Sequence, residues 1–477
     1  MSRSPSPGPF LLGLLYLVPV ALWANSAPLE TRFLDRSTSL TSVGVACALA
    51  GVSAFSLNLV LGARLHFVER LFGGLDRMYR AHRVNGRIAF LMVLAHAILI
   101  LAGRASLSTE ALSALFDLST GAQVWLGVVA LAAMASSLFL TLYVRLTHEA
   151  FVYVQRSFGL IFIVASLHVF LTPGAKATSR PLTLYLLTLV GCGLVAFTYR
   201  SLFGDLLVRR FPHTVAEVNA LDDYVTEFVL RPKGRRLSFL PGQFVYVNFR
   251  SGGLREQLHP LDVSSEGQSM VFAVRLGDIS NQFHPFSITS SPTDPMLRIT
   301  VKAVGDYTRA IRALEVGADA VVEGPYGSFS YRKVANRRQV WLSGGIGLTP
   351  FLSMARSLQP EEHYEIDLYY CVENERETYF LEEFQEIAAV KPGLRVILCI
   401  REHTGLVTAA RIAETSGDLA ALDHLICGPP AMIVSLRAQL IEAGVPLAQI
   451  HAEEFSFTRI GHRSAQQRRG VAGARTA

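Results

Sequence analysis

Two histidines lie fourteen residues apart in one long apolar run of the N-terminal half. Between His82 and His96 a helix completes almost four turns and rises about 21 Å, so both imidazoles lie on one face at two depths. Polar side chains within a membrane are costly and usually functional. His168 lies in a later apolar run and is a natural partner for His96. The arrangement favours bis-histidine ligation of haem iron; histidines that only hydrogen-bond to neighbouring helices are the alternative.

A glycine-rich turn lies between an apolar strand and a helix in the C-terminal half. Glycines allow the backbone to approach a pyrophosphate, Thr349 can cap the following helix, and Pro350 suits its first turn. A lone turn of this kind is weak evidence for a nucleotide site. The candidate residues are Gly344, Gly345, Gly347, Thr349 and Pro350.

Six apolar runs are expected to position the histidines. Because a spanning helix needs about 20 apolar residues, the candidates are residues 10–25, 41–62, 84–103, 122–143, 155–172 and 181–199. Arginines gather after the second, fourth and sixth runs, whereas the other connections mix charges. The apolar runs therefore predict six spans, and the positive-inside rule places both termini in the cytoplasm. A bacterial inner membrane is the expected location. The first run lacks a clean cleavage site, so we interpret it as a span.

The remaining chain has the pattern of two further domains. Short alternating strands at 225–230, 243–249, 298–303 and 319–323 predict an antiparallel β-barrel. Strands at 339–343, 366–371, 395–400 and 424–427 alternate with helices from Pro350, Thr378 and Pro430, which predicts an α/β domain with a parallel sheet. We expect a six-helix transmembrane domain at 1–208, a barrel at 211–333, a nucleotide-binding domain at 336–460 and a disordered basic tail at 461–477.

Composition excludes several other classes of protein. Of the 477 residues 51% are hydrophobic, which is too apolar for an ordinary soluble protein. The net charge of +6 comes with arginines that flank apolar runs, so nucleic-acid binding is not expected. None of the five cysteines forms a CxxC pair, so neither an iron–sulfur cluster nor a zinc site is predicted.

With these features the chain resembles the ferric reductase and NADPH oxidase superfamily. That family has six transmembrane helices, with two histidines each on the third and fifth. The segment 151–159, followed by His168, is similar to the fifth helix, and the resemblance assigns Gln155 to the position of the fourth histidine. Glutamine is a poor iron ligand beside imidazole. We therefore expect one or two haem b groups, with an inner haem that is weakened, held by His148 or His66 instead, or absent.

A second resemblance begins at a His-Pro-Phe-Ser run in the polar half. It is similar to the FAD-binding signature of the ferredoxin–NADP reductase superfamily, with a generic strand–turn–helix as the alternative. On this resemblance Pro285 and Ser287 would face the polar edge of the flavin. Thr308 is predicted to cap a helix beginning at Arg309, whose N–H groups would face the pyrophosphate. The residues assigned to FAD are His284, Pro285, Phe286, Ser287, Thr289, Lys302, Gly305, Tyr307 and Thr308. An earlier His259-Pro260 run loosely echoes this motif, through partial duplication or chance.

The same superfamily resemblance extends to the nucleotide site. It implies that Cys427 lies beside the nicotinamide and that a C-terminal aromatic, Phe457 or secondarily Phe455, stacks on the flavin; two core phenylalanines are the alternative. The family favours NADPH over NADH, although Glu373 would repel a 2′-phosphate that Arg376 and Arg401 would attract. The further residues assigned to nucleotide or flavin are Gly324, Pro325, Gly327, Gly428 and Pro429.

The resemblance implies electron transfer from NAD(P)H through FAD and haem, held by His82, His96 and His168, to an external acceptor. A ferric chelate is the first expectation for the acceptor; dioxygen giving superoxide, or a membrane or periplasmic redox partner, are the alternatives. Two other readings stay open: a non-catalytic membrane protein with a degenerate reductase module, and a flavin reductase that the bundle merely anchors. Nothing in the sequence indicates the oligomeric state or the role of the insertion at 251–283.

Overall fold

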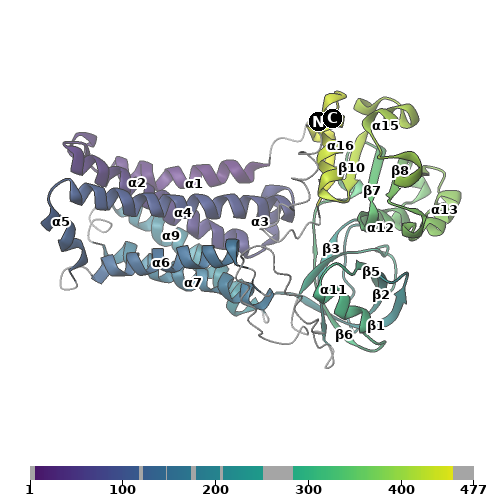
Figure 1. Ribbon diagram of the computed structural model, residues 1–477, viewed down its shortest axis with the longest axis horizontal. Coiled ribbons are helices and arrows are strands. Elements are labelled where there is room, and N and C mark those ends of the chain that lie inside the picture. Colours follow the sequence, from purple (N-terminus) through teal and green to yellow (C-terminus); the bar gives the residue numbers. More distant parts are fainter. Residues whose placement is uncertain are drawn as a thin grey trace, which may run out of the picture. The chain divides into compact units, whose positions relative to one another are not determined.

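The computed structural model describes residues 6–117, 122–144, 146, 148–172, 179–204, 208–250 and 283–454. They belong to two compact units, one of helices ending at Val208 and one beginning at Arg209 (Figure 1). The echo at His259-Pro260 and the candidates Phe455 and Phe457 lie outside the described residues.

The N-terminal unit has six helices long and apolar enough to cross a membrane, as predicted. Most of them begin earlier than the apolar runs, and the difference is largest for α4, which begins at Leu75 rather than residue 84, and α7, which begins at His148 rather than residue 155. Apolar length measures the hydrocarbon core, whereas a helix can continue with polar residues beyond it. The six are α1 (Pro7–Ala24), α2 (Arg36–Gly62), α4 (Leu75–Ala105), α6 (Ala122–Tyr143), α7 (His148–Leu171) and α9 (Arg180–Phe197), with the short helices α3 (His66–Phe72) and α5 (Thr109–Ser113) between them.

Helix α2 packs closely against α4 and α9 through small residues. A Cβ atom on Gly51 would lie 3.0 Å from Val93, and one on Gly193 would lie 2.6 Å from the hydroxyl of Ser56. Small residues let helix backbones approach in a membrane, where van der Waals packing rather than the hydrophobic effect holds helices together. This close packing positions α4, which carries two of the candidate histidines.

The second unit begins with a six-stranded antiparallel sheet in the order β4-β3-β6-β1-β2-β5. A bridge between Ile288 and Ile299 joins its two edges, so the predicted barrel is confirmed and nearly closed. Strand β1 was not predicted separately, because a register shift between Val215 and Glu217 interrupts its alternation. The strands are β1 (Arg210–Ala220), β2 (Val225–Pro232), β3 (Phe244–Arg250), β4 (His284–Ser287), β5 (Leu297–Lys302) and β6 (Asp319–Tyr326).

A five-stranded parallel sheet follows, in the order β11-β10-β7-β8-β9, and confirms the predicted α/β domain. One face packs on α12 (Thr349–Ser357) and α13 (Leu381–Val390), and the other on α15 (Ala409–Ser416) and α16 (Pro430–Glu442). The chain order reverses between β7 and β10, where α/β sheets bind ligands at the carboxyl ends of the strands. The strands are β7 (Arg338–Gly344), β8 (Glu365–Val372), β9 (Leu394–Ile400), β10 (Asp423–Cys427) and β11 (Ile450–Glu453).

Candidate functional site

Two predicted nucleotide segments meet at the carboxyl ends of β7 and β10. A Cβ atom on Gly347 would lie 2.4 Å from the carbonyl oxygen of Cys427, and one on Gly428 would lie 3.0 Å from the Cα atom of Gly344. The two loops therefore touch backbone to backbone. Gly345 has a φ of 53° and open space where a side chain would stand. Backbone exposed in this way at the switch point fits a pyrophosphate.

The helix after the glycine-rich turn begins differently from the prediction. A 3₁₀ turn at Gly345–Leu348 leads into α12, and Leu348 takes the cap position. The hydroxyl of Thr349 donates to the carbonyl of Ile346 at 3.0 Å, so the predicted capping role of Thr349 is wrong. The extra 3₁₀ turn moves the cap one residue upstream. Pro350 stands in the first helical turn, as predicted. The next helix, α13, begins at Leu381 rather than Thr378, which instead ends a 3₁₀ turn.

The predicted flavin segment contains a stacked pair of rings. His284 of β4 and Tyr307 lie with ring centroids 3.6 Å apart and planes inclined by 21°. In the same segment Ser287 is buried, and the buried hydroxyl of Thr289 has no hydrogen-bond partner among the described residues. An unsatisfied buried hydroxyl is costly. This segment therefore has both an aromatic surface and an unused polar group, which fit a flavin nucleotide.

The turn after β5 differs from the prediction in its helix. Helix α11 spans Asp306–Ala310 and is capped by Gly305, so it begins before Arg309. The hydroxyl of Thr308 accepts hydrogen bonds from the N–H groups of Val304 and Gly305, both at 2.9 Å. Thr308 is therefore not the residue that precedes the helix, as predicted; it is the third residue of α11, and its hydroxyl completes a capping box with Gly305.

Lys302, at the end of β5, pairs with a carboxylate of the nucleotide domain. Its ammonium lies 3.3 Å from the carboxylate of Glu377. A flavin phosphate would compete with this carboxylate for Lys302. The assignment of Lys302 to the FAD site remains a prediction.

The end of β6 lies close to the end of β11. Gly324 and Gly327 have φ values of 142° and 97°, which only glycine adopts readily, and Pro325 lies between them. A Cβ atom on Gly327 would lie 3.4 Å from the carboxylate of Glu453. The thiol of Cys427 is fully buried, and its pKa is raised by burial and then by the negative charge of Glu453. A neutral thiol at this position suits packing beside an uncharged ring, not nucleophilic chemistry.

In the helical unit each candidate histidine is held by a carbonyl of a neighbouring helix. The Nδ1 atoms of His82, His96 and His168 lie 3.1, 2.9 and 2.6 Å from their acceptors. Histidines that bind metals almost always donate one ring N–H in this way, which orients the ring and leaves the other nitrogen for the metal. The acceptors are the carbonyl oxygens of Asn58, Gly44 and Gln123.

His96 and His168 face one another across the bundle. Their ring centroids are 6.3 Å apart, with planes inclined by 58°. Two metal–imidazole bonds of about 2 Å, with about 1 Å from each nitrogen to its ring centre, require about 6 Å. The separation therefore fits two imidazoles that would hold one metal ion between them. No group of three or more His, Cys, Asp or Glu side chains that could hold a metal occurs among the described residues.

Gln155 has a different environment. Its amide donates to the hydroxyl of Thr141 on α6 at 3.4 Å, and the nearby hydroxyls of Ser137 and Ser157 lie 3.3 Å apart. These contacts join α6 to α7 through polar side chains. Of the two proposed substitutes, His66 begins α3, and the side chain of His148 lies outside the described part of the chain.

A polar cluster beside His82 was not predicted from the sequence. Asn85, which is 1% exposed, donates to the carbonyl of Ala54 at 2.8 Å and to the side chain of Asn58 at 3.0 Å. The hydroxyl of Tyr16 donates to the Asn85 side chain, so α1, α2 and α4 are joined at this point. The sequence feature that could have indicated this cluster is Asn85, a polar residue inside an apolar run. The cluster orients the backbone whose Asn58 carbonyl holds His82.

Three family models match successive parts of the chain. The ferric reductase like transmembrane component matches residues 47–166, a span that includes His82, His96 and Gln155. An FAD-binding domain matches residues 267–330, and an oxidoreductase NAD-binding domain matches residues 341–438. The chain joins a ferric reductase-like transmembrane domain to a reductase module of the ferredoxin–NADP reductase type. This module has the flavin and nucleotide domains of an NAD(P)H-dependent oxidoreductase, and the ferric reductase-like domain is an integral membrane domain.

Curated relatives match the reductase module. A ferredoxin–NAD(P)(+) reductase component of naphthalene 1,2-dioxygenase/salicylate 5-hydroxylase systems from Ralstonia sp is 30% identical over 175 residues, 34% of this chain and 53% of that protein. Methane monooxygenase component C from Methylosinus trichosporium is 26% identical over 219 residues, 44% of this chain and 57% of that protein. The chain spans about half the length of the curated relatives it matches.

Solved structures are similar at lower identity. The flavohem-like FAD/NAD-binding domain of nitric oxide dioxygenase from Vibrio cholerae has a TM-score of 0.41 and 21% identity, covering 51% of this chain and 98% of that one. Flavohemoglobin from Malassezia yamatoensis has a TM-score of 0.46 and 18% identity, covering 91% and 99%.

Proposed function

We propose that this protein transfers electrons from cytosolic NAD(P)H, by way of FAD and haem b, to chelated ferric iron outside the membrane. The observation that supports the haem is the separation of 6.3 Å between the rings of His96 and His168. Six apolar helices and the distribution of arginines support a topology with both termini in the cytoplasm. The proposed domains are those stated from the sequence, with boundaries near residues 208, 211, 333, 336 and 460.

The helical unit provides the iron ligands. His96 and His168 would hold an outer haem, and their hydrogen bonds to Gly44 and Gln123 orient the rings. His82, held by Asn58, would offer an inner haem one ligand, while Gln155 is hydrogen-bonded to Thr141. We therefore propose one firmly held haem and a weakened or missing second one. When bound, haem supplies one-electron transfer, and FAD supplies acceptance of hydride and release of single electrons.

The reductase module provides the nucleotide sites. The backbone of the loops at Gly344–Leu348 and Gly428 would bind the pyrophosphate of NAD(P)H, and Cys427 would lie beside the nicotinamide. The segment from His284 to Thr308 would bind FAD. Phe457 is proposed to stack on the flavin. The choice between NADH and NADPH depends on Glu373 and Arg401, which pair with each other at 3.0 Å.

The proposal is tested with the purified full chain in detergent. Consumption of NADPH or NADH should match the formation of a ferrous chelate, and a superoxide trap in the same assay should stay silent. Superoxide formed at the rate of nucleotide consumption would make dioxygen the acceptor instead. Protein that binds no haem and whose flavin NAD(P)H does not reduce would overturn the proposal in favour of a non-catalytic membrane protein. Flavin reduction without haem would indicate an anchored flavin reductase.

A further inference from the structure

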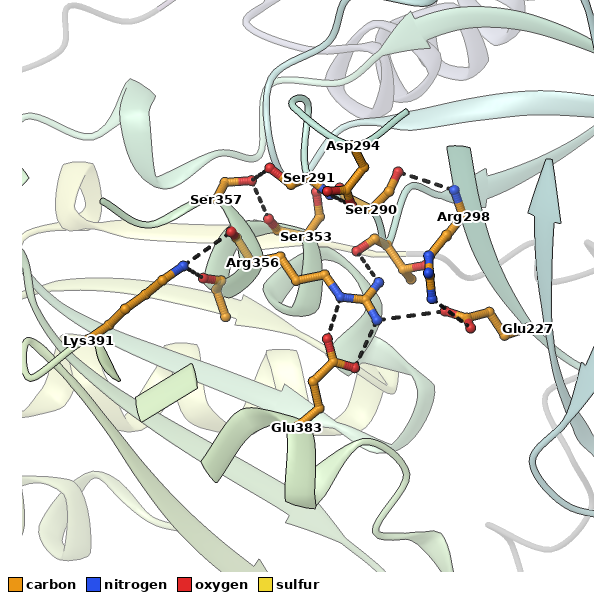
Figure 2. Close-up of polar contacts among 12 residues, drawn as sticks. Glu227, Ser290, Ser291, Asp294, Arg298, Ser353, Arg356, Ser357, Glu383 and Lys391 are labelled. Carbon is orange, nitrogen blue, oxygen red and sulfur yellow. Dashed lines mark hydrogen bonds and ion pairs between the residues drawn. The ribbon is translucent and has the colours of Figure 1, made fainter. Parts of the chain in front are cut away.

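One face of α12 bonds to the segment that follows the flavin strand (Figure 2). The hydroxyl of Ser353 donates to the carbonyl of Ser290 at 2.7 Å, and that of Ser357 to the hydroxyl of Ser291 at 3.3 Å. Between them, Arg356 donates to the carbonyl of Thr289 at 2.8 Å. The spacing of these side chains, three and four residues apart, is that of a single helix face. The nucleotide-domain helix is thus bonded to three successive residues of the flavin domain.

Arg356 stands at the centre of this contact. Its Nε and Nη2 atoms lie 2.6 and 2.8 Å from the two carboxylate oxygens of Glu383 on α13. Its guanidinium also lies 3.8 Å from the carboxylate of Glu227, while only 11% of the side chain is exposed. A two-pronged pair of this kind restricts both the position and the rotation of the guanidinium. Arg356 therefore joins α12, α13 and the barrel at one point.

Glu227 brings the barrel into the same network. It lies on β2, is 3% exposed, and is 3.5 Å from Arg298 of the adjacent strand β5. Burying a carboxylate without partners is unfavourable, and the two arginines offset part of that cost. Two arginines and two glutamates thus balance in charge at the domain contact (Figure 2).

The position of α12 gives this network a consequence for the reaction. Its first residue, Thr349, directly follows the glycine-rich turn, and its last turn is held by Lys391, whose ammonium donates to the carbonyls of Ala355 and Arg356 at 2.9 and 3.1 Å. A helix of nine residues is a rigid rod of about 13 Å. One end of this rod therefore bears the proposed pyrophosphate site, and the other is bonded to the flavin segment.

We propose that Arg356 is a positioning residue for hydride transfer: through Glu383, Glu227 and the Thr289 carbonyl it holds the nucleotide domain at the distance from the flavin strand that the reaction requires. The inference rests on the proposed flavin and nucleotide sites and is independent of the haem and of the external acceptor. Reaction rates respond steeply to such geometry, since a misplacement of about 1 Å costs about 100-fold.

The test compares Arg356→Lys and Glu383→Gln with wild type in the full chain loaded with FAD. Lysine keeps the charge but loses the two-pronged geometry. We expect the rate of flavin reduction by NADH or NADPH, measured by stopped-flow absorbance, to fall about 10–100-fold in Arg356→Lys. The KM should change by less than about 3-fold and the FAD content should stay the same, because neither residue is a proposed ligand of either nucleotide. The absorbance of the flavin–nicotinamide charge-transfer complex should weaken in parallel.

A matched control comes from the surface of the same domain. Arg395 makes a similar two-pronged pair with Asp367 at 2.8 and 2.7 Å, but 56% of its side chain is exposed. Arg395→Lys should leave the rate of flavin reduction unchanged. If Arg356→Lys and Glu383→Gln lower only thermal stability or FAD content, with a normal rate per bound flavin, the network is purely structural and the inference is overturned.

The outcome also distinguishes this inference from the proposed function. Wild-type flavin that NAD(P)H does not reduce would overturn both. A wild-type protein that reduces its flavin but no ferric chelate would overturn only the proposed acceptor. Should Arg356→Lys not bind FAD, Glu383→Gln provides the same measurement with the arginine in place.

Discussion

In the helical unit His82, His96 and His168 are each held by one backbone carbonyl of a neighbouring helix, whereas in the reductase module Arg356 is held by two carboxylates and a carbonyl. Both regions bury polar side chains, but one orients them with neutral partners and the other with charges. Within lipid an ion pair is expensive, and a metal ligand must keep one nitrogen available. Between two domains exposed to water, opposite charges can restrict a side chain in several directions at once.

Because the two regions use separate side chains and partners, we expect that a substitution can abolish the function of the helical unit or of the reductase module without affecting the other. The largest effect is expected from His168→Ala, which removes one of two facing ligands 6.3 Å apart. Loss of even an outer-shell partner of a metal ligand costs about 10–100-fold, so ferric-chelate reduction should fall by more than about 100-fold. The low-spin haem spectrum should disappear, while NAD(P)H should still reduce the flavin at the wild-type rate.

A control for this variant is His451→Ala in the reductase module, which should leave the haem spectrum intact. His451 pairs with Asp423 at 2.7 Å, far from the bundle in sequence. Low-spin haem persisting in His168→Ala would contradict the assignment of this ligand.

Gln155→His should produce the next largest effect. Among the described residues the amide of Gln155 makes one long hydrogen bond, to Thr141, so the substitution breaks this weak contact and supplies an imidazole. We expect the haem content per flavin to increase, or a high-spin component to become low-spin, as measured by pyridine haemochrome assay and by electron paramagnetic resonance. Two low-spin haems already present in the wild-type protein would show that Gln155 does not weaken the inner site.

In the reductase module, Glu373→Gln should change the preference for the nucleotide. Arg401 lies 3.0 Å from both carboxylate oxygens of Glu373, and both side chains are about half exposed. Removing the carboxylate eliminates repulsion of a 2′-phosphate and leaves Arg401 available to bind it. The ratio of kcat/KM for NADPH to that for NADH should increase about 5–10-fold. Equal changes for both nucleotides, or the same shift in the exposed control Glu375→Gln, would contradict this assignment.

The smallest expected effect concerns the pH dependence of the charge network at Glu227. The pKa of Glu227 is raised because burial removes its hydration, which Arg356 and Arg298 offset only in part. Between the unfolded value of about 4.3 and the raised folded value, the folded protein binds more protons, so this group makes wild-type stability fall as pH rises. In Glu227→Gln this group no longer titrates, so its contribution to the loss of stability is absent. The melting temperature of the variant minus that of wild type should therefore increase by about 1–3 °C between acid and neutral pH.

Flavin fluorescence during heating measures that difference at each pH. The exposed Glu365, paired with Arg338 at the surface, supplies the control Glu365→Gln, for which no such trend is expected. A difference that stays constant with pH, or that decreases, would contradict the raised pKa of Glu227.

Much of the fold could be predicted because its signals are local. Long apolar runs predicted the six helices, and alternation of strands with helices predicted the parallel sheet. Predictions of which single residue begins a helix were less accurate. Thr308 and Thr349 both lie inside their helices rather than at the N-cap, which is Gly305 in α11 and Leu348, at the end of a 3₁₀ turn, in α12. In sequence, a threonine at the N-cap cannot be distinguished from a threonine inside the first turn of the helix.

By itself the sequence determined which chemical groups the chain carries and in what order: three histidines in apolar helices, a flavin motif and a glycine-rich turn. Hydrophobic length and backbone conformational preference act over a few residues, so they can be read directly. Only the tertiary structure showed that His96 and His168 face one another. It alone also showed that Arg356 contacts Thr289, Glu383 and Glu227. These partners are distant in the chain, and helix packing and domain docking bring them together. In sequence, a serine–arginine–serine face on a short helix is indistinguishable from a face exposed to water.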